Sequence, residues 1–267
     1  DPLWSRGLGD VYKRQVFALV KDTLATLELL PDAAQPFILR ALVRCVDATR
    51  DGHALAAQVR GMYYPLIMHA AQARFDSAAH ASPVSLSSAL SLWHALVDAA
   101  DPSTSGAVHI HILSQLPAMV TSVEQHLANA DVQVSAGRAT LALLRALPEL
   151  QNASTLLAGS AQHVLELLRA MLTSLTDQPR VSGLDATFED LLVLYLSLLE
   201  ELVRACASSD AAEANAPHAD DLRSLCLGAF GAVMPMLKRD VLTIPSVAEA
   251  FAQLVHVLLI MARSALY

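Results

Sequence analysis

Apolar residues recur every three or four positions along most of this chain, which is the spacing of amphipathic helices. Strict alternation of apolar and polar residues, which half-buried strands show, is absent. The same spacing places Leu225 and Leu259 on the core faces of two late helices. The clearest stripe consists of Leu157, Ala161, Val164, Leu168, Met171 and Leu175. The pattern predicts an all-α fold.

Proline, glycine and aspartate residues interrupt the pattern and divide the chain into separate helices. The predicted helices cover residues 16–30, 36–50, 53–75, 84–100, 107–128, 131–147, 154–175, 185–205, 220–239 and 245–261. We expect an interruption between Gly61 and Pro65 and a kink at Pro117. Ser246 and Glu249 have the spacing of a capping box at the start of the last helix.

The helices form antiparallel pairs whose first members begin near residues 36, 84, 131, 185 and 245. The step of roughly 50 residues is slightly longer than the repeat of HEAT and armadillo proteins, which is about 40 to 47 residues. Because a pair cannot bury its apolar faces alone, it has to stack on neighbouring pairs. We therefore predict an α-solenoid of HEAT/armadillo-like helix pairs over residues 16–267, as a segment of a longer protein.

The mean hydropathy of +0.41 raises the question of a membrane span. The best candidate, residues 102–123, contains no Asp, Glu, Lys or Arg. It does contain many Ser, Thr, His and Gln residues, which are too polar for a span of about 20 apolar residues. We expect a buried helix there and no membrane insertion.

Residues that could carry chemistry do not occur in catalytic patterns. The three cysteines are widely spaced, which argues against a disulfide framework or a cysteine metal site. His109 and His111 are two apart on a predicted helix and point in different directions, so they cannot share one metal ion. Ser160 follows Gly159 inside a helical stripe, and Gly228 and Gly231 are assigned to helix packing. We expect no enzymatic activity and no cofactor.

Acidic residues gather late in the chain. Residues 185–221 contain nine acidic residues and one basic residue, Arg204, so their balance equals the net charge of −8 of the whole chain. Two interpretations stay open: a solvated helix face followed by a flexible acidic loop over 207–217, or a surface that attracts a basic partner. The residues assigned to that surface are Asp185, Glu189, Asp190, Glu200 and Glu201. Lys and Arg form no concentrated stripe, so we expect no nucleic-acid binding.

Two stretches resemble a known family. They are TFEDLLVLYLSLLEELV at 187–203 and LRSLCLGAFGAVMPMLKRDVLTIPSVAEAFAQLVHVLL at 222–259. Both are similar to the later part of exportins of the importin-β (karyopherin) superfamily, and closest to the exportin-4 group. The most specific part is MPML at 234–237, then DVL at 240–242 and IP at 244–245. Ala252 and Val257 depart from the pattern, since the family has aromatic residues there. The first residues, 1–15, resemble instead a peptide translated from adapter sequence, and we expect a non-native or disordered leader.

The resemblance implies a nuclear export receptor, a HEAT superhelix that binds protein cargo cooperatively with Ran-GTP. Such receptors pass through the pore in contact with nuclear pore proteins and shuttle between nucleus and cytoplasm. In the exportin-4 group the cargo is a translation factor that bears the basic hypusine residue. The alternative is a HEAT or armadillo protein-protein interaction scaffold in another assembly.

Overall fold

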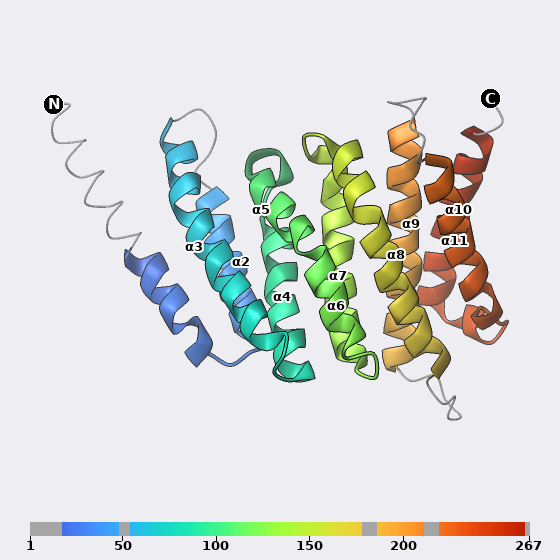
Figure 1. Cartoon of the computed structure of the whole chain (residues 1–267), viewed down its shortest axis with the longest axis horizontal. Coiled ribbons are helices and arrows are strands. Elements are labelled where there is room, and N and C mark those ends of the chain that lie inside the picture. The colour runs from blue at the N-terminus through green and yellow to red at the C-terminus, as the bar shows by residue number, and fades with distance from the viewer. Residues whose placement is uncertain (1–17, 48–53, 178–185, 211–218, 265–267) are drawn as a thin grey trace.

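A computed structural model describes residues 18–47, 54–177, 186–210 and 219–264 of the chain. Every regular element within these ranges is a helix and none is a strand, which confirms the all-α prediction (Figure 1). The predicted leader, residues 1–15, lies outside the described residues.

The helices agree closely with the predicted segments. Residues 18–26 are helical and lead into the 3-10 turn η1, Leu27–Leu29. The long helices that follow are α2 (Gln35–Asp47), α3 (Ala54–Ala78), α4 (Pro83–Ala99), α5 (Pro102–Ser114), α6 (Leu116–Glu124), α7 (Ala130–Ala146), α8 (Ala153–Asp177), α9 (Ala186–Asp210), α10 (Ala219–Val233) and α11 (Pro245–Ser264). Short 3-10 turns are η2 (Leu147–Glu149), η3 (Met234–Met236) and η4 (Val241–Thr243).

The chain alternates between two layers of helices (Figure 1). The first layer contains α2, α4, α7, α9 and α11, each packed against the next. The second layer contains α3, then α5 with α6, then α8 and α10. The first-layer helices begin at Gln35, Pro83, Ala130, Ala186 and Pro245, which are the predicted pair starts to within one residue.

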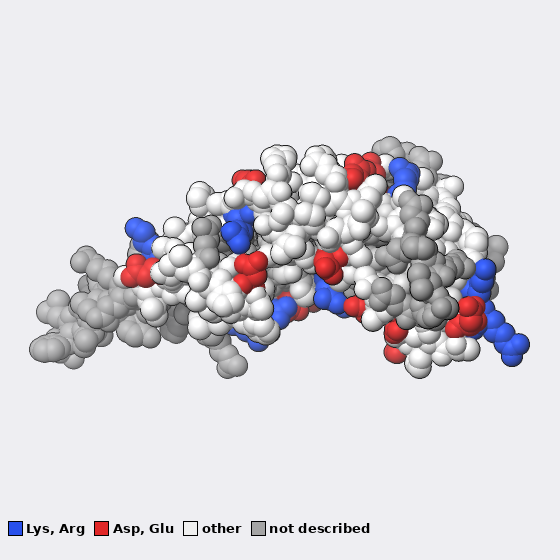
Figure 2. All heavy atoms as spheres, turned by 90° about the horizontal axis from the view of Figure 1, so that it is seen from below, with Lys and Arg blue, Asp and Glu red and all other residues white. Residues whose placement is uncertain are grey.

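The molecule is an arch, hollowed along one side (Figure 2). Contacts between successive helices are more extensive in the first layer than in the second. The second layer faces the viewer in Figure 1 and forms the convex side of the arch in Figure 2. The closely packed first layer therefore lines the hollow side.

Close packing in the first layer depends on Gly137 in α7. A Cβ atom at this position would lie 2.5 Å from Cδ2 of Leu194 in α9, closer than atoms can approach without a shift. Gly228 and Gly231, which we had assigned to helix packing, have nothing within 4 Å of such a Cβ. That assignment was wrong, because both glycines face open space on α10.

Prolines act as expected at one site and not at another. The predicted kink at Pro117 is confirmed, because α5 ends at Ser114 and Pro117 lies in the first turn of α6, where its missing N–H costs nothing. The predicted interruption between Gly61 and Pro65 is not found, since α3 runs through both residues. Tyr63 and Tyr64, which precede Pro65, are both buried, so this part of α3 is packed into the fold although the proline removes one backbone hydrogen bond.

Some boundaries and faces at the C-terminal end also differ from the prediction. The α9 helix continues to Asp210 through the first part of the loop expected at 207–217, and residues 211–217 lie outside the described ones. Leu225 and Leu259 are 46% and 65% exposed, so both were wrongly assigned to the core. Ser246 does not cap α11, because the helix already begins at Pro245.

In the described ranges, α11 is the one helix that is long and apolar enough to cross a membrane. Its buried residues recur at helical spacing and face the rest of the fold: Val247, Ala250, Leu254, Val257 and Met261. The helix packs lengthwise against α9, as each first-layer helix packs against its neighbour. The former candidate span, 102–123, is broken into α5 and α6 at Gln115.

Candidate functional site

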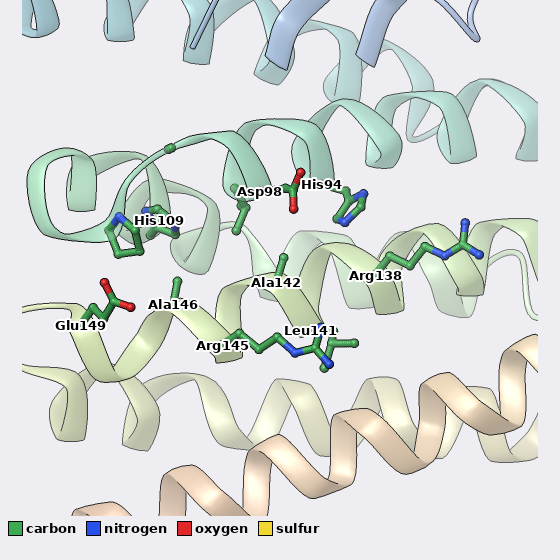
Figure 3. A pocket seen from close by; sticks show the side chains of 12 residues that line it. His94, Asp98, His109, Arg138, Leu141, Ala142, Arg145, Ala146 and Glu149 are labelled. Atoms are coloured by element: carbon green, nitrogen blue, oxygen red, sulfur yellow. The ribbon is translucent and has the colours of Figure 1, made fainter. Parts of the chain in front are cut away.

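A groove opens between α4 and α7, with α5 at one end (Figure 3). Its volume is about 480 Å³. The floor is built from small and apolar side chains, namely Val97, Ala100, Pro102, Leu141, Ala142 and Ala146. Polar residues surround this floor: His94, Asp98, His109, Arg138, Arg145 and Glu149. Because α4 and α7 are first-layer helices, the groove lies on the layer that lines the hollow side.

Ion pairs join the groove to the neighbouring helices of the first layer. Arg40 Nε on α2 lies 3.2 Å from Asp98 Oδ2 on α4. The two arginines of α7 reach α9, Arg138 to Asp190 at 3.6 Å and Arg145 to Glu201 at 3.3 Å. The side chains of Arg138 and Arg145 are 55% and 60% exposed, so their guanidinium groups remain accessible to a partner.

The acidic residues that we assigned to a partner-binding surface are divided between separate places. Asp185 lies outside the described residues. Glu189 accepts a hydrogen bond of 2.5 Å from Ser246 on α11, and Asp190 is the ion-pair partner on α9 of an α7 arginine. Glu200 and Glu201 follow about 15 Å further along α9, at 1.5 Å per residue. Four described carboxylates thus form no single patch.

Glu200 and Glu201 are largely buried, with exposed fractions of 5% and 9%. Arg204 on the same helix pairs with both carboxylates. Burial raises the pKa of Glu200, and the charge of Arg204 opposes this rise. The exposed acidic surface is therefore smaller than the residue count indicates, and partner binding by these carboxylates stays a prediction.

His109 on α5 is completely buried where it lines the groove. Neither ring nitrogen has a hydrogen-bond partner among the described residues. Burial lowers the pKa of the imidazole, and the neighbouring backbone of Ser105 and Val97 raises it to a smaller extent. The imidazole is therefore neutral near pH 7, with one donor and one acceptor nitrogen. Burial likewise lowers the pKa of His94.

A polar cluster around Asp47 positions α5 and hence His109. The Tyr64 hydroxyl on α3 donates to Asp47 Oδ1 at 2.5 Å, and the Ser105 hydroxyl donates to the same oxygen at 2.7 Å. The backbone N–H of Asp101 donates to Asp47 Oδ2 at 3.0 Å. Burial and the bond to Asp47 raise the pKa of Tyr64, so its hydroxyl stays a donor. The carboxylate thus ties the end of α2 to the start of α5.

Sequence reasoning did not find the groove. It named His109 only as a metal candidate, and within the described ranges no three His, Cys, Asp or Glu side chains gather as metal ligands. The groove residues come from α4, α5, α7 and η2 and from Ala100 after α4, and no local motif connects them. The apolar floor can pack against apolar side chains of a partner. The charged residues can replace their present ion pairs with ion pairs to that partner. No protein-family model, curated protein or solved structure matches the chain.

Proposed function

We propose that this chain is an α-solenoid of HEAT/armadillo-like helix pairs that binds a protein partner along its hollow side. The two-layer alternation of helices supports this proposal, because each pair packs only against its neighbours and leaves an extended curved surface. The observation that carries the proposal is the groove between α4 and α7, which adds an apolar floor and accessible charges to that surface.

Exposed ion pairs suit a surface that exchanges partners. Arg138 and Asp190 are both more than half exposed, and an exposed pair of this kind contributes about 1 kcal/mol or less to stability. A partner that offers its own carboxylate can therefore take over Arg138 at small cost to the fold. Charges arranged in this way also set the orientation and rate of association.

Charge reversal tests the proposal. Partners captured from extract are cross-linked to the chain, and the cross-linked positions are mapped by mass spectrometry. We expect the cross-links to fall on the first layer and to be lost in Arg138→Glu/Arg145→Glu. Arg169→Glu, at an exposed position of α8 in the second layer, is the matched control and should retain them. Cross-links that fall on the convex side, or that survive the double reversal, contradict the proposal.

The specific form that we propose is a segment of a nuclear export receptor. Its support is the resemblance to exportins of residues 187–203, which lie in α9, and of residues 222–259, which contain most of α10 and α11. In this form the partners are Ran-GTP, a protein cargo such as a hypusine-bearing translation factor, and nuclear pore proteins. The protein then shuttles between nucleus and cytoplasm.

The nucleotide state of Ran separates this form from a scaffold in another assembly. The complete protein is used to capture cargo from nuclear extract in the presence of Ran locked with GTP or with GDP. An exportin should recover more cargo with the GTP form, because each ligand favours the conformation that the other binds. Equal recovery in both states rules out the exportin form and leaves the general scaffold.

A further inference from the structure

We propose that two copies of this chain pair through the side of α11 that faces away from α9, with the two α11 helices antiparallel. The pairing goes beyond the proposed function, because it uses the end of the arch that α10 and α11 form and not its hollow side (Figure 1). The residues that carry it, called the outer stripe, recur at a spacing of three and four along α11: Ala248, Ala252, Val255, Leu259 and Ala262.

The apolar pattern of α11 is that of a helix packed on two sides. The first-layer helices α4, α7 and α9 each lie between two neighbours of the same layer. The α11 helix packs on α9 through its buried row, and the outer stripe is a second apolar row about a third of a turn around the helix. Leu259, the largest residue of this second row, is 65% exposed. An apolar row of this length in contact with water indicates a binding surface.

The apolar surface continues from α11 onto α10. Phe251 of α11 stacks on Phe230 of α10, with the ring centroids 6.4 Å apart. Leu227 and Met234 lie three and four residues from Phe230, on the same side of the helix, and are 52% and 42% exposed. The surface therefore spans both end helices. A contact between two copies uses the same patch on each of them, so it buries this surface twice.

The charges beside the outer stripe favour a second copy in the antiparallel orientation. Glu249 and Arg263 are exposed near the two ends of α11, and the 14 residues between their positions make almost four full turns. Both therefore lie on the same edge of the stripe. With a two-fold axis beside Val255, Glu249 of each copy lies level with Arg263 of the other. A parallel pair would place like charges together, and charges at such edges set helix orientation.

The sizes of the side chains are complementary in the same arrangement. Ala252 of each copy lies opposite Leu259 of the other, and Val255 lies at the axis. A small residue opposite a large one lets two helices approach closely, as Gly137 of α7 does against Leu194 of α9. The outer stripe thus fits a copy of itself, which is what a contact with two-fold symmetry requires.

Analytical ultracentrifugation of the whole chain over a range of concentrations tests the pairing. We expect a reversible monomer-dimer equilibrium. Leu259→Glu places a charge in the outer stripe and should abolish the dimer. Leu29→Glu makes the same change at a leucine of η1 that is 82% exposed, and this matched control should dimerise like the unmodified chain. A dimer that survives Leu259→Glu, or that is lost in both variants, overturns the inference.

Charge reversal tests the antiparallel orientation. Glu249→Arg and Arg263→Glu should each weaken the dimer by about tenfold, because each variant turns two attractive pairs into repulsive ones. The double variant Glu249→Arg/Arg263→Glu restores both pairs and should regain the affinity of the unmodified chain. Failure of this rescue overturns the antiparallel arrangement.

A chain that stays monomeric at every concentration also overturns the inference, because the outer stripe is then covered by something other than a second copy. The cross-linking experiment on the hollow side does not depend on this result. The two proposals therefore fail independently.

Discussion

Arg145 on α7 and Glu201 on α9 are 56 residues apart in the chain, and the arginine Nε lies 3.3 Å from the carboxylate Oε1. The Glu201 side chain is 11% exposed, whereas the Arg145 side chain is 60% exposed. A largely buried carboxylate thus depends on an arginine that is open to solvent. This contact joins two first-layer helices beside the groove, so the stability of the layer and the binding surface share one residue.

We expect Arg145→Met to lower the free energy of unfolding by about 1 kcal/mol, because it leaves Glu201 with Arg204 as its remaining cation, at 3.7 Å. Arg138→Met is the matched control on the same helix. It should change the free energy by less than about 0.5 kcal/mol, since both members of its ion pair are more than half exposed. Urea unfolding followed by circular dichroism measures both values. Equal losses of unfolding free energy in the two variants would contradict the view that the burial of Glu201 strengthens its dependence on Arg145.

Gly137→Ala should destabilise the protein by about 1 to 3 kcal/mol, because its Cβ would overlap Leu194 in α9. The higher helix propensity of alanine offsets at most about 1 kcal/mol of this loss. Thermal unfolding measures the change as a lower Tm.

Gly159→Ala is the control for this substitution, since nothing lies within 4 Å of a Cβ at that position on α8. It should raise stability by up to about 1 kcal/mol through helix propensity alone. The same sign for both alanine variants would show that α7 and α9 are not in close contact at Gly137.

Ser246→Ala should weaken the attachment of α11 to α9 by about 1 kcal/mol, because the Ser246 hydroxyl donates to the carboxylate of Glu189. Hydrogen exchange of the α11 amides is the direct measurement and should become faster. Ser224→Ala on α10 is the control at an exposed serine and should leave exchange unchanged. If Ser246 acted as a capping residue instead, faster exchange would be confined to the first turn of α11.

The pH dependence of stability should reveal the burial of Glu200. Because burial raises the pKa of Glu200, its carboxyl group binds a proton more tightly in the folded state than in the unfolded state. The contribution of Glu200 to stability is therefore lost as the pH rises. The stability of Glu200→Gln relative to the unmodified protein should therefore increase from about pH 4 to about pH 7.

Glu166→Gln should show the opposite trend. Hydrogen bonds from Gln162 and His163 lower the pKa of Glu166, so its contribution to stability is present at neutral pH and is lost in acid. The relative stability of this variant should decrease from about pH 4 to about pH 7. Parallel curves for the two glutamine variants would mean that Glu200 is not desolvated.

The order and length of the helices were predictable from the sequence alone. Local spacing of apolar residues and the positions of proline and aspartate decide where an amphipathic helix begins and ends, and both are written in neighbouring residues. Pro83 and Pro102 at helix starts, and Pro117 after the break at Gln115, follow this rule. The predicted pair starts near residues 36, 84, 131, 185 and 245 therefore coincide with the first-layer helices.

The groove and the state of its charges were decided by tertiary structure. Ion pairing depends on distances between residues that are far apart in the chain, so a count along residues 185–221 could not include Arg138 and Arg145 of the neighbouring helix. The burial of Glu200 and the exposure of Leu259 likewise depend on how each helix is rotated about its axis against its neighbour. Helical periodicity fixes this rotation only to within a fraction of a turn. Sequence determined the helices of this protein, and packing determined which of their faces are available to a partner.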